Sequence, residues 1–139
     1  MASVRRPGQA GKLIADKRLG LRSKIWPDLD EDKLWLRTRA KGFTTIPRTL
    51  PLVLRILDSL SRGRPLSSVY LDLWARVHDE CIVQISNPRE RAFYSGFSGQ
   101  RAVLVWRERM QKLADLGFID AKPGANGPFS MSCFGIHIS

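Results

Sequence analysis

The chain has 139 residues, 43% of them apolar, which is enough for one ordinary hydrophobic core and too few for two independent ones. Lys and Arg number 23 against 13 Asp and Glu, so the formal net charge of +10 indicates a polyanionic partner. No run approaches the roughly 18 consecutive apolar residues of a membrane-spanning helix, so we expect a cytoplasmic protein without a membrane partner.

The N-terminal segment is basic and has little to bury. Residues 1–24 hold seven basic side chains against one acid, Asp16. Such a segment cannot recover its ordering entropy from packing, so we predict a flexible basic arm over residues 1–25. Arg5 and Arg6 are the arm residues that we expect to contact nucleic acid, and a merely solvating tail is the alternative.

Helices are predicted for the middle of the chain. Residues 30–40 have helix-like but imperfect apolar spacing, and we expect the preceding acids of "DLDED", residues 28–32, to balance charge or cap a helix rather than bind magnesium. From residue 48 to 61 the apolar residues recur every three or four positions, which predicts a core helix. A second helix follows, capped by Ser67 or Ser68. The buried stripes of these two helices are expected to be Leu50, Val53, Leu54, Leu57 and Leu60 on the first, and Tyr70, Leu73, Trp74 and Val77 on the second.

The last third of the chain alternates strand and helix signals. Residues 81–86 are rich in β-branched side chains and predict a short strand. Asn87 and Pro88 predict the start of a short helix that Gly96 ends, and Ser98 is expected to cap a longer helix. The longer helix has an apolar face, ends at Gly117 and is followed by a predicted β-hairpin. Its buried face is expected to comprise Ala102, Trp106, Met110 and Leu113.

This order of a short helix, a glycine-containing turn of three or four residues, a longer helix and a hairpin resembles a winged helix-turn-helix domain of the bacterial-regulator type. The resemblance depends on Ala92, Gly96, Ser98 and Ala102, and on "WRERMQKLADLGFI", residues 106–119. The small alanines allow two helices to cross closely, and glycine allows the turn. The resemblance implies a mainly α fold with a small β-hairpin and additional N-terminal helices. The winged-helix domain would span residues 26–139, with the helix-turn-helix at about 88–116 and the wing at about 118–138.

The resemblance also implies double-stranded DNA as the partner, with the longer helix in the major groove. Ser98, with the backbone amides at the helix start, would hold a phosphate, while Gln100 and Arg101 would reach base edges. Arg107 would lie near the flank of the groove, and Lys122 on the hairpin would place its charge on an adjacent phosphate or in the minor groove.

Leu104 departs from this pattern, because an apolar residue stands where the family usually has a polar one. It would contact a thymine methyl group or belong to a homodimer or partner interface. Two alternatives to DNA regulation therefore remain. One is an adaptor that binds protein, and the other is a replication-initiator-like or RNA-binding use of the same fold.

We expect neither an enzyme nor a metal protein. His78, Cys81, Cys133 and His137 are the ligand types of a zinc site, but along a straight strand the last two would lie about 13 Å apart. A Cys81 nucleophile with His78 as base would lack an identifiable oxyanion site. No catalytic residue, metal ligand or cofactor is therefore predicted.

Overall fold

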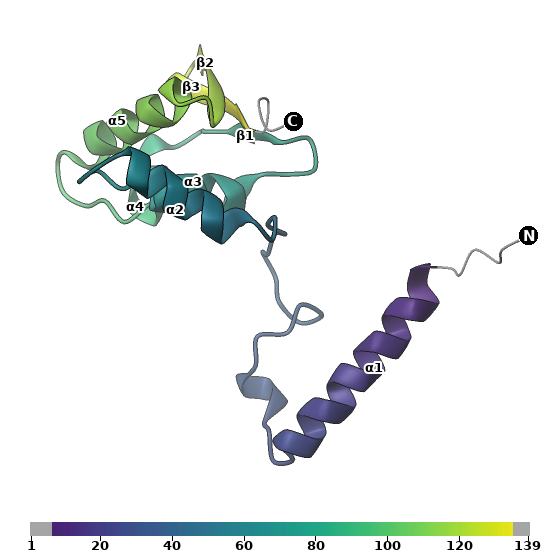
Figure 1. The fold of residues 1–139 in the computed structure, drawn as a ribbon. Helices are drawn as coiled ribbons and strands as arrows, with labels where there is room; N and C mark the ends of the chain where they lie inside the picture. Colours follow the sequence, from purple (N-terminus) through teal and green to yellow (C-terminus); the bar gives the residue numbers. More distant parts are fainter. Residues whose placement is uncertain (1–6, 135–139) are drawn as a thin grey trace, which may run out of the picture. The chain divides into compact units, whose positions relative to one another are not determined.

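The computed structural model describes residues 7–134 and divides between Lys41 and Gly42 into two compact units (Figure 1). The N-terminal unit contains helix α1 (Pro7–Ile25) and a 3₁₀ turn, η1 (Glu31–Lys33). The elements of the C-terminal unit are α2 (Leu50–Leu60), α3 (Ser67–Arg76), β1 (Ile82–Gln84), α4 (Pro88–Tyr94), α5 (Ala102–Asp115), β2 (Ile119–Gly124) and β3 (Gly127–Phe134).

We predicted a flexible basic arm over residues 1–25, and the structure has the 19-residue helix α1 over Pro7–Ile25. No side chain between Gly8 and Ile25 is buried, so packing does not account for the helix. Ala, Leu, Lys and Arg have high helix propensity and supply most of the residues of this segment. The prediction considered burial and charge, but it did not count this propensity.

The predicted helix over residues 30–40 is wrong, because only η1 forms. None of residues 26–41 is buried, so no packed face holds a longer helix. The acids serve the purpose expected of them. Asp30 Oδ1 accepts a hydrogen bond from the Asp32 N–H at 3.0 Å, and Glu31 pairs with Arg22 at 2.9 Å and with Arg39 at 3.4 Å.

The C-terminal unit confirms a mainly helical fold with a small antiparallel sheet. The strand order is β1-β3-β2, with Val83 opposite Ser132 and Lys122 opposite Met131. The early strand β1 therefore joins the C-terminal hairpin, a pairing that the sequence pattern alone did not predict. Helix α5 packs against α3 and α4 and also against β2, and it leads directly into the hairpin (Figure 1).

The core follows the predicted helix stripes closely. Trp106, Met110 and Leu113 are buried on α5, as expected. Leu60 was expected on the buried stripe of α2 but is 51% exposed, because α2 ends there and the chain turns away. The buried apolar side chains are Leu50, Leu57, Leu66, Val69, Tyr70, Leu73, Val83, Ile85, Ala92, Trp106, Met110, Leu113, Ile119 and Phe129.

The start of α3 is held by a side chain of α2 rather than by its own serines. Asp58 Oδ1 accepts hydrogen bonds from the N–H groups of Leu66 and Ser67, both at 2.9 Å. The predicted capping by Ser67 or Ser68 is therefore wrong, because Leu66 occupies the cap position without a side-chain cap bond. The carboxylate accepts from backbone N–H groups that have no partner within the helix, and its negative charge interacts favourably with the positive end of the helix dipole.

Deleting residues 2–24 should leave a folded protein. Among residues 8–133 the buried apolar cluster lies between residues 50 and 129, and no side chain of α1 from Gly8 to Ile25 is buried. We expect the shortened chain to keep a single cooperative thermal transition close in temperature to that of the full chain, as followed by circular dichroism. Loss of the cooperative transition would show that α1 is needed for folding.

Candidate nucleic-acid interface

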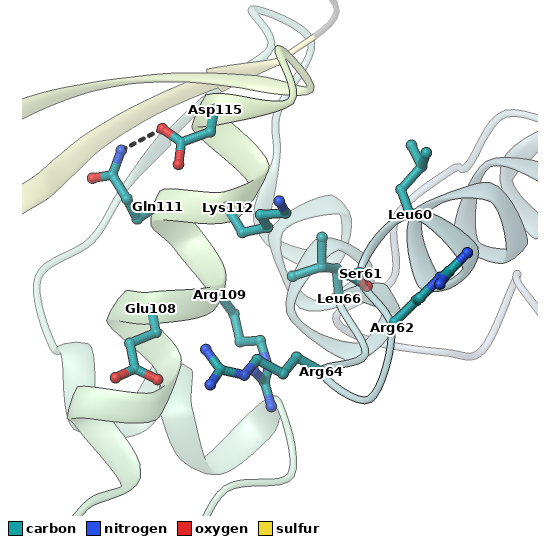
Figure 2. A pocket seen from close by; sticks show the side chains of 10 residues that line it. All are labelled: Leu60, Ser61, Arg62, Arg64, Leu66, Glu108, Arg109, Gln111, Lys112 and Asp115. Carbon is teal, nitrogen blue, oxygen red and sulfur yellow. Dashed lines mark hydrogen bonds between the residues drawn. The ribbon is translucent and has the colours of Figure 1, made fainter.

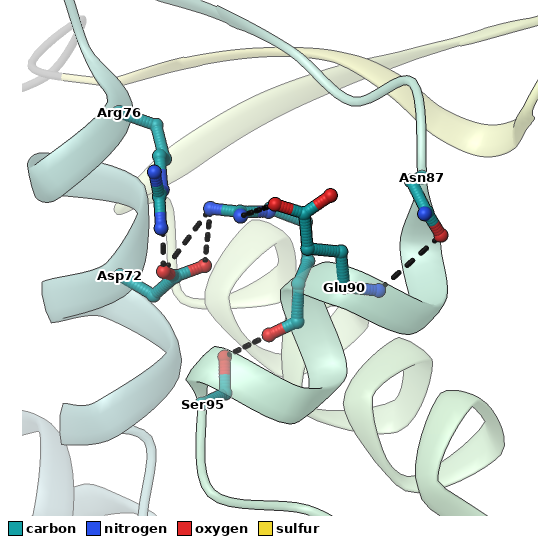
Figure 3. Close-up of polar contacts among 6 residues, drawn as sticks. Asp72, Arg76, Asn87, Glu90 and Ser95 are labelled. Carbon is teal, nitrogen blue, oxygen red and sulfur yellow. Dashed lines mark hydrogen bonds and ion pairs between the residues drawn. The ribbon is translucent and has the colours of Figure 1, made fainter.

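Helix α4 begins and ends as the sequence predicts. Asn87 Oδ1 accepts a hydrogen bond from the Glu90 N–H at 3.3 Å, and Pro88 occupies the first turn (Figure 3). At the other end Ser95 Oγ donates to the Arg91 carbonyl at 2.7 Å. Gly96 has φ +93°, a left-handed conformation that favours glycine. The chain therefore leaves α4 in a defined direction.

The turn between α4 and α5 is longer than predicted. Helix α5 begins at Ala102, so Ser98 does not cap it, and the residue at the cap position is Arg101, which makes no side-chain cap bond. Gly99 has φ +88°, which cannot continue a helix, and its carbonyl accepts from the Ala102 N–H at 3.3 Å. Ser98, Gln100 and Arg101 thus lie in the turn before α5 rather than on its first helical turn. All three are exposed.

The outer side of α5 carries charges of both signs. Leu104 is 47% exposed, whereas its apolar neighbours Val103 and Val105 are half-buried. Glu108 and Asp115 are exposed on the same helix, and neither was considered in the sequence analysis. These carboxylates would repel a phosphate backbone close to them, so the first part of α5 is the more favourable end for DNA.

Two of the predicted cations lie at the hairpin. Lys122 is exposed on β2. Arg107, exposed on α5, reaches the turn of the hairpin, because its Nη2 lies 3.4 Å from where a Cβ on Gly127 would stand. The sequence separates Arg107 from this turn by about twenty residues, and the packing of α5 against the sheet brings them together.

The predicted arm residues Arg5 and Arg6 lie outside the described residues. The cations of the N-terminal segment that the structure describes are on α1, and only Arg22 among them is paired within residues 7–134. They are Lys12, Lys17, Arg18, Arg22 and Lys24.

A buried ion pair joins α3 to α4 (Figure 3). Arg91 Nη1 lies 3.1 Å from each carboxylate oxygen of Asp72, and both side chains are almost fully buried. Arg76 Nε lies 3.6 Å from the same carboxylate. Burial raises the pKa of Asp72 above its usual value, although the nearby guanidinium groups of Arg91 and Arg76 act in the opposite direction.

The sequence analysis missed a basic pocket of about 610 Å³ between α5 and the turn after α2 (Figure 2). Arg62 and Arg64, in that turn, line it together with Arg109 and Lys112 of α5. The repeated pattern of "RGR" at residues 62–64, directly after an amphipathic helix, is a signal that could have indicated it.

Metal ligands do not gather in the part of the chain that the structure describes. No group of three or more His, Cys, Asp or Glu side chains within residues 7–134 could hold an ion. Cys81 is exposed and Cys133 is half-buried on the strand beside it. His137, the fourth residue of the zinc alternative, lies outside the described residues.

Comparison with protein-family models, with curated proteins and with solved structures finds no match to this chain. No helix within residues 7–134 is both long and apolar enough to cross a membrane.

Proposed function

We propose that residues 42–134 form a winged helix-turn-helix domain that binds double-stranded DNA. The supporting observation is that α4 and α5 pack together beside a three-stranded antiparallel sheet, while the polar side chains proposed to contact DNA stay exposed around α5. Gln100 and Arg101 stand at its start, Arg107 along it, and Lys122 on the hairpin packed beside it. This order of elements is compatible with the winged-helix resemblance.

In this proposal the residues that reach base edges lie in the turn before α5, whereas the sequence analysis expected them on the first turn of the helix. Gln100 and Arg101 enter the major groove ahead of α5, where glutamine suits adenine and arginine suits guanine. Ser98 donates to a phosphate beside them. Arg107 and Lys122 contact the backbone at the hairpin side of the groove, and contacts of this kind position the protein without reading sequence.

The charge of the whole chain supports a polyanion as partner. The net charge is +10, and α1 adds exposed cations next to a single acid, Asp16. Neutralised phosphates release counterions, so such cations raise affinity for any DNA sequence. We propose that α1 contributes this general attraction, together with Arg5 and Arg6, and that the protein serves as a transcriptional regulator or as an accessory factor of a mobile element.

Binding of duplex DNA should weaken steeply with salt. Each phosphate contact contributes about −0.9 to the slope of log K against log salt, so Lys122→Ala should flatten that slope by about one unit.

Arg101→Ala should cost about 1–3 kcal/mol of binding free energy on a preferred sequence and much less on random DNA, because base-edge contacts carry the sequence information. Fluorescence anisotropy with both kinds of duplex over a salt series measures these effects. Absence of binding at low salt would refute the proposal.

A protein partner is the second candidate, because apolar side chains stand exposed near the same turn. Phe93 is 69% exposed on α4, and Leu104 is 47% exposed on α5. A second copy of the chain or a protein partner bound at this surface would bury both side chains. If Arg101→Ala leaves DNA binding unchanged while Leu104→Ala abolishes association with another chain or a second copy, measured by sedimentation, the adaptor is the correct function. Stronger binding to single-stranded RNA than to duplex DNA would instead favour the RNA-binding or replication-initiator-like alternative.

A further inference from the structure

The pocket between α5 and the turn after α2 combines positive charge with unpaired donors. Four cationic side chains line it against two carboxylates, Glu108 and Asp115. Asp115 accepts a hydrogen bond from Gln111 Nε2 at 2.8 Å (Figure 2). Within residues 7–134, none of the four cations forms an ion pair with a carboxylate.

Arg109 is the central group of this pocket. Its Nε is buried and has no hydrogen-bond acceptor among the described residues. Within residues 7–134 its guanidinium also forms no ion pair with a carboxylate, so its charge is left for a ligand of the pocket. Its Cζ lies 5.8 Å from the ring centre of Phe97, a cation–π contact that orients the guanidinium.

Arg64 approaches the same space from the other side. Arg64, in the turn after α2, and Arg109, on α5, both line the pocket (Figure 2). Cations that line one pocket repel each other, and an anion bound there would neutralise this repulsion.

The turn that presents Arg64 is held by hydrogen bonds of its own. Ser61 Oγ donates to the Leu57 carbonyl at 2.8 Å, and the Arg64 N–H donates to the Ser61 carbonyl at 2.9 Å. Gly63, with φ +73°, makes the reversal, and Asp58 fixes the next residues to α2. The guanidinium groups are thus presented by a turn and a helix that are ordered without a ligand, which lowers the cost of binding.

We propose that this pocket binds a phosphoryl group, with Arg64 and Arg109 as its two principal donors. The planar fork of arginine matches phosphate oxygens bidentately, and Lys112 adds a point charge. The volume of about 610 Å³ is within the roughly 300–1,000 Å³ of small-molecule sites, and Leu60 and Leu66 give it an apolar wall. The phosphoryl group comes either from a free phosphorylated molecule or from a DNA backbone, and the site does not depend on the DNA-binding proposal.

Titration of the full-length protein with inorganic pyrophosphate tests the site by isothermal calorimetry. We expect binding that Arg109→Gln and Arg64→Gln each weaken about 10- to 100-fold, the value of a charge-assisted contact. Arg55→Gln, an exposed arginine of α2 that does not line the pocket, should leave it unchanged. Because Arg64 lies in an exposed turn, its replacement preserves the fold and keeps the test valid if Arg109→Gln unfolds.

The source of the phosphoryl group follows from repeating the titration with saturating duplex DNA. Competition assigns the pocket to a backbone phosphate, whereas simultaneous binding assigns it to a free phosphorylated molecule. Absence of pyrophosphate binding, or equal binding by the Arg64, Arg109 and Arg55 variants, overturns the proposal. Neither result depends on whether the protein binds DNA.

Discussion

Replacing Asp72 by alanine should lower the free energy of unfolding by about 3 kcal/mol. Removing one member of a buried ion pair leaves the other charge without its partner, which typically costs about 3–5 kcal/mol. Arg91 would keep the half-exposed carboxylate of Glu90, 3.4 Å away, and its contact with the ring of Tyr94, so the lower end of that range applies. Urea denaturation followed by circular dichroism measures the change.

The double variant Asp72→Leu/Arg91→Leu is the matched control. Burial raises the pKa of Asp72, so its ionised form is less favourable in the folded protein than in the unfolded chain. The resulting loss of folding stability is absent at a pH below the unfolded pKa and complete above the folded pKa. The intact pair therefore offsets a large desolvation cost, and removing both charges together should cost much less than removing Asp72 alone. A double variant less stable than Asp72→Ala would contradict this account.

Replacing Trp106 by alanine should cost about 3–5 kcal/mol of unfolding free energy, because a large buried aromatic leaves a cavity. Trp106 is 1% exposed and meets the ring of Phe129 edge to face, with centroids 6.1 Å apart. One ring belongs to α5 and the other to β3, so the loss also loosens the hairpin on the helix. Urea denaturation measures the stability, and a DNA-binding assay on the folded fraction tests whether the proposed interface depends on this packing.

Trp106→Phe separates packing from polarity. The indole Nε1 is buried and has no acceptor among the described residues, so phenylalanine removes an unsatisfied donor while retaining an aromatic ring. We expect it to cost well under half of the alanine value. If the two substitutions cost the same, the indole N–H has a partner in the native protein.

The helices of the C-terminal unit could be predicted because their packing repeats in the sequence. The stripe of Trp106, Met110 and Leu113 and the cap of Asn87 are local patterns, and the structure confirms both. The pairing of β1 with β3 could not be predicted, because strand pairing depends on partners far apart in the chain. The start of α5 was predicted too early. Ser98 is a good capping residue, but the positive φ of Gly99 prevents a helix from beginning directly after it.

The candidate site was predictable only in part, because some of its residues come together from distant parts of the chain. Arg101, Leu104 and Lys122 are exposed as their positions suggest. Arg64 and Arg109 line one pocket although a turn and a helix some forty residues apart supply them, and no sequence periodicity predicts this. The capping of α3 by Asp58 also crosses between helices, and a search for a local serine cap could not find it.

The helical form of α1 limits how many of its charges can act together. In a helix of 3.6 residues per turn, Lys17 and Lys24 lie on one side, whereas Arg18 and Arg22 lie on another. Arg22 is also engaged by Glu31. If the proposed DNA complex forms, a straight helix can place only one of these sides against a row of phosphates, so we expect counterion release from α1 to correspond to about two contacts. A flexible arm of the same composition could turn all of its cations toward one polyanion.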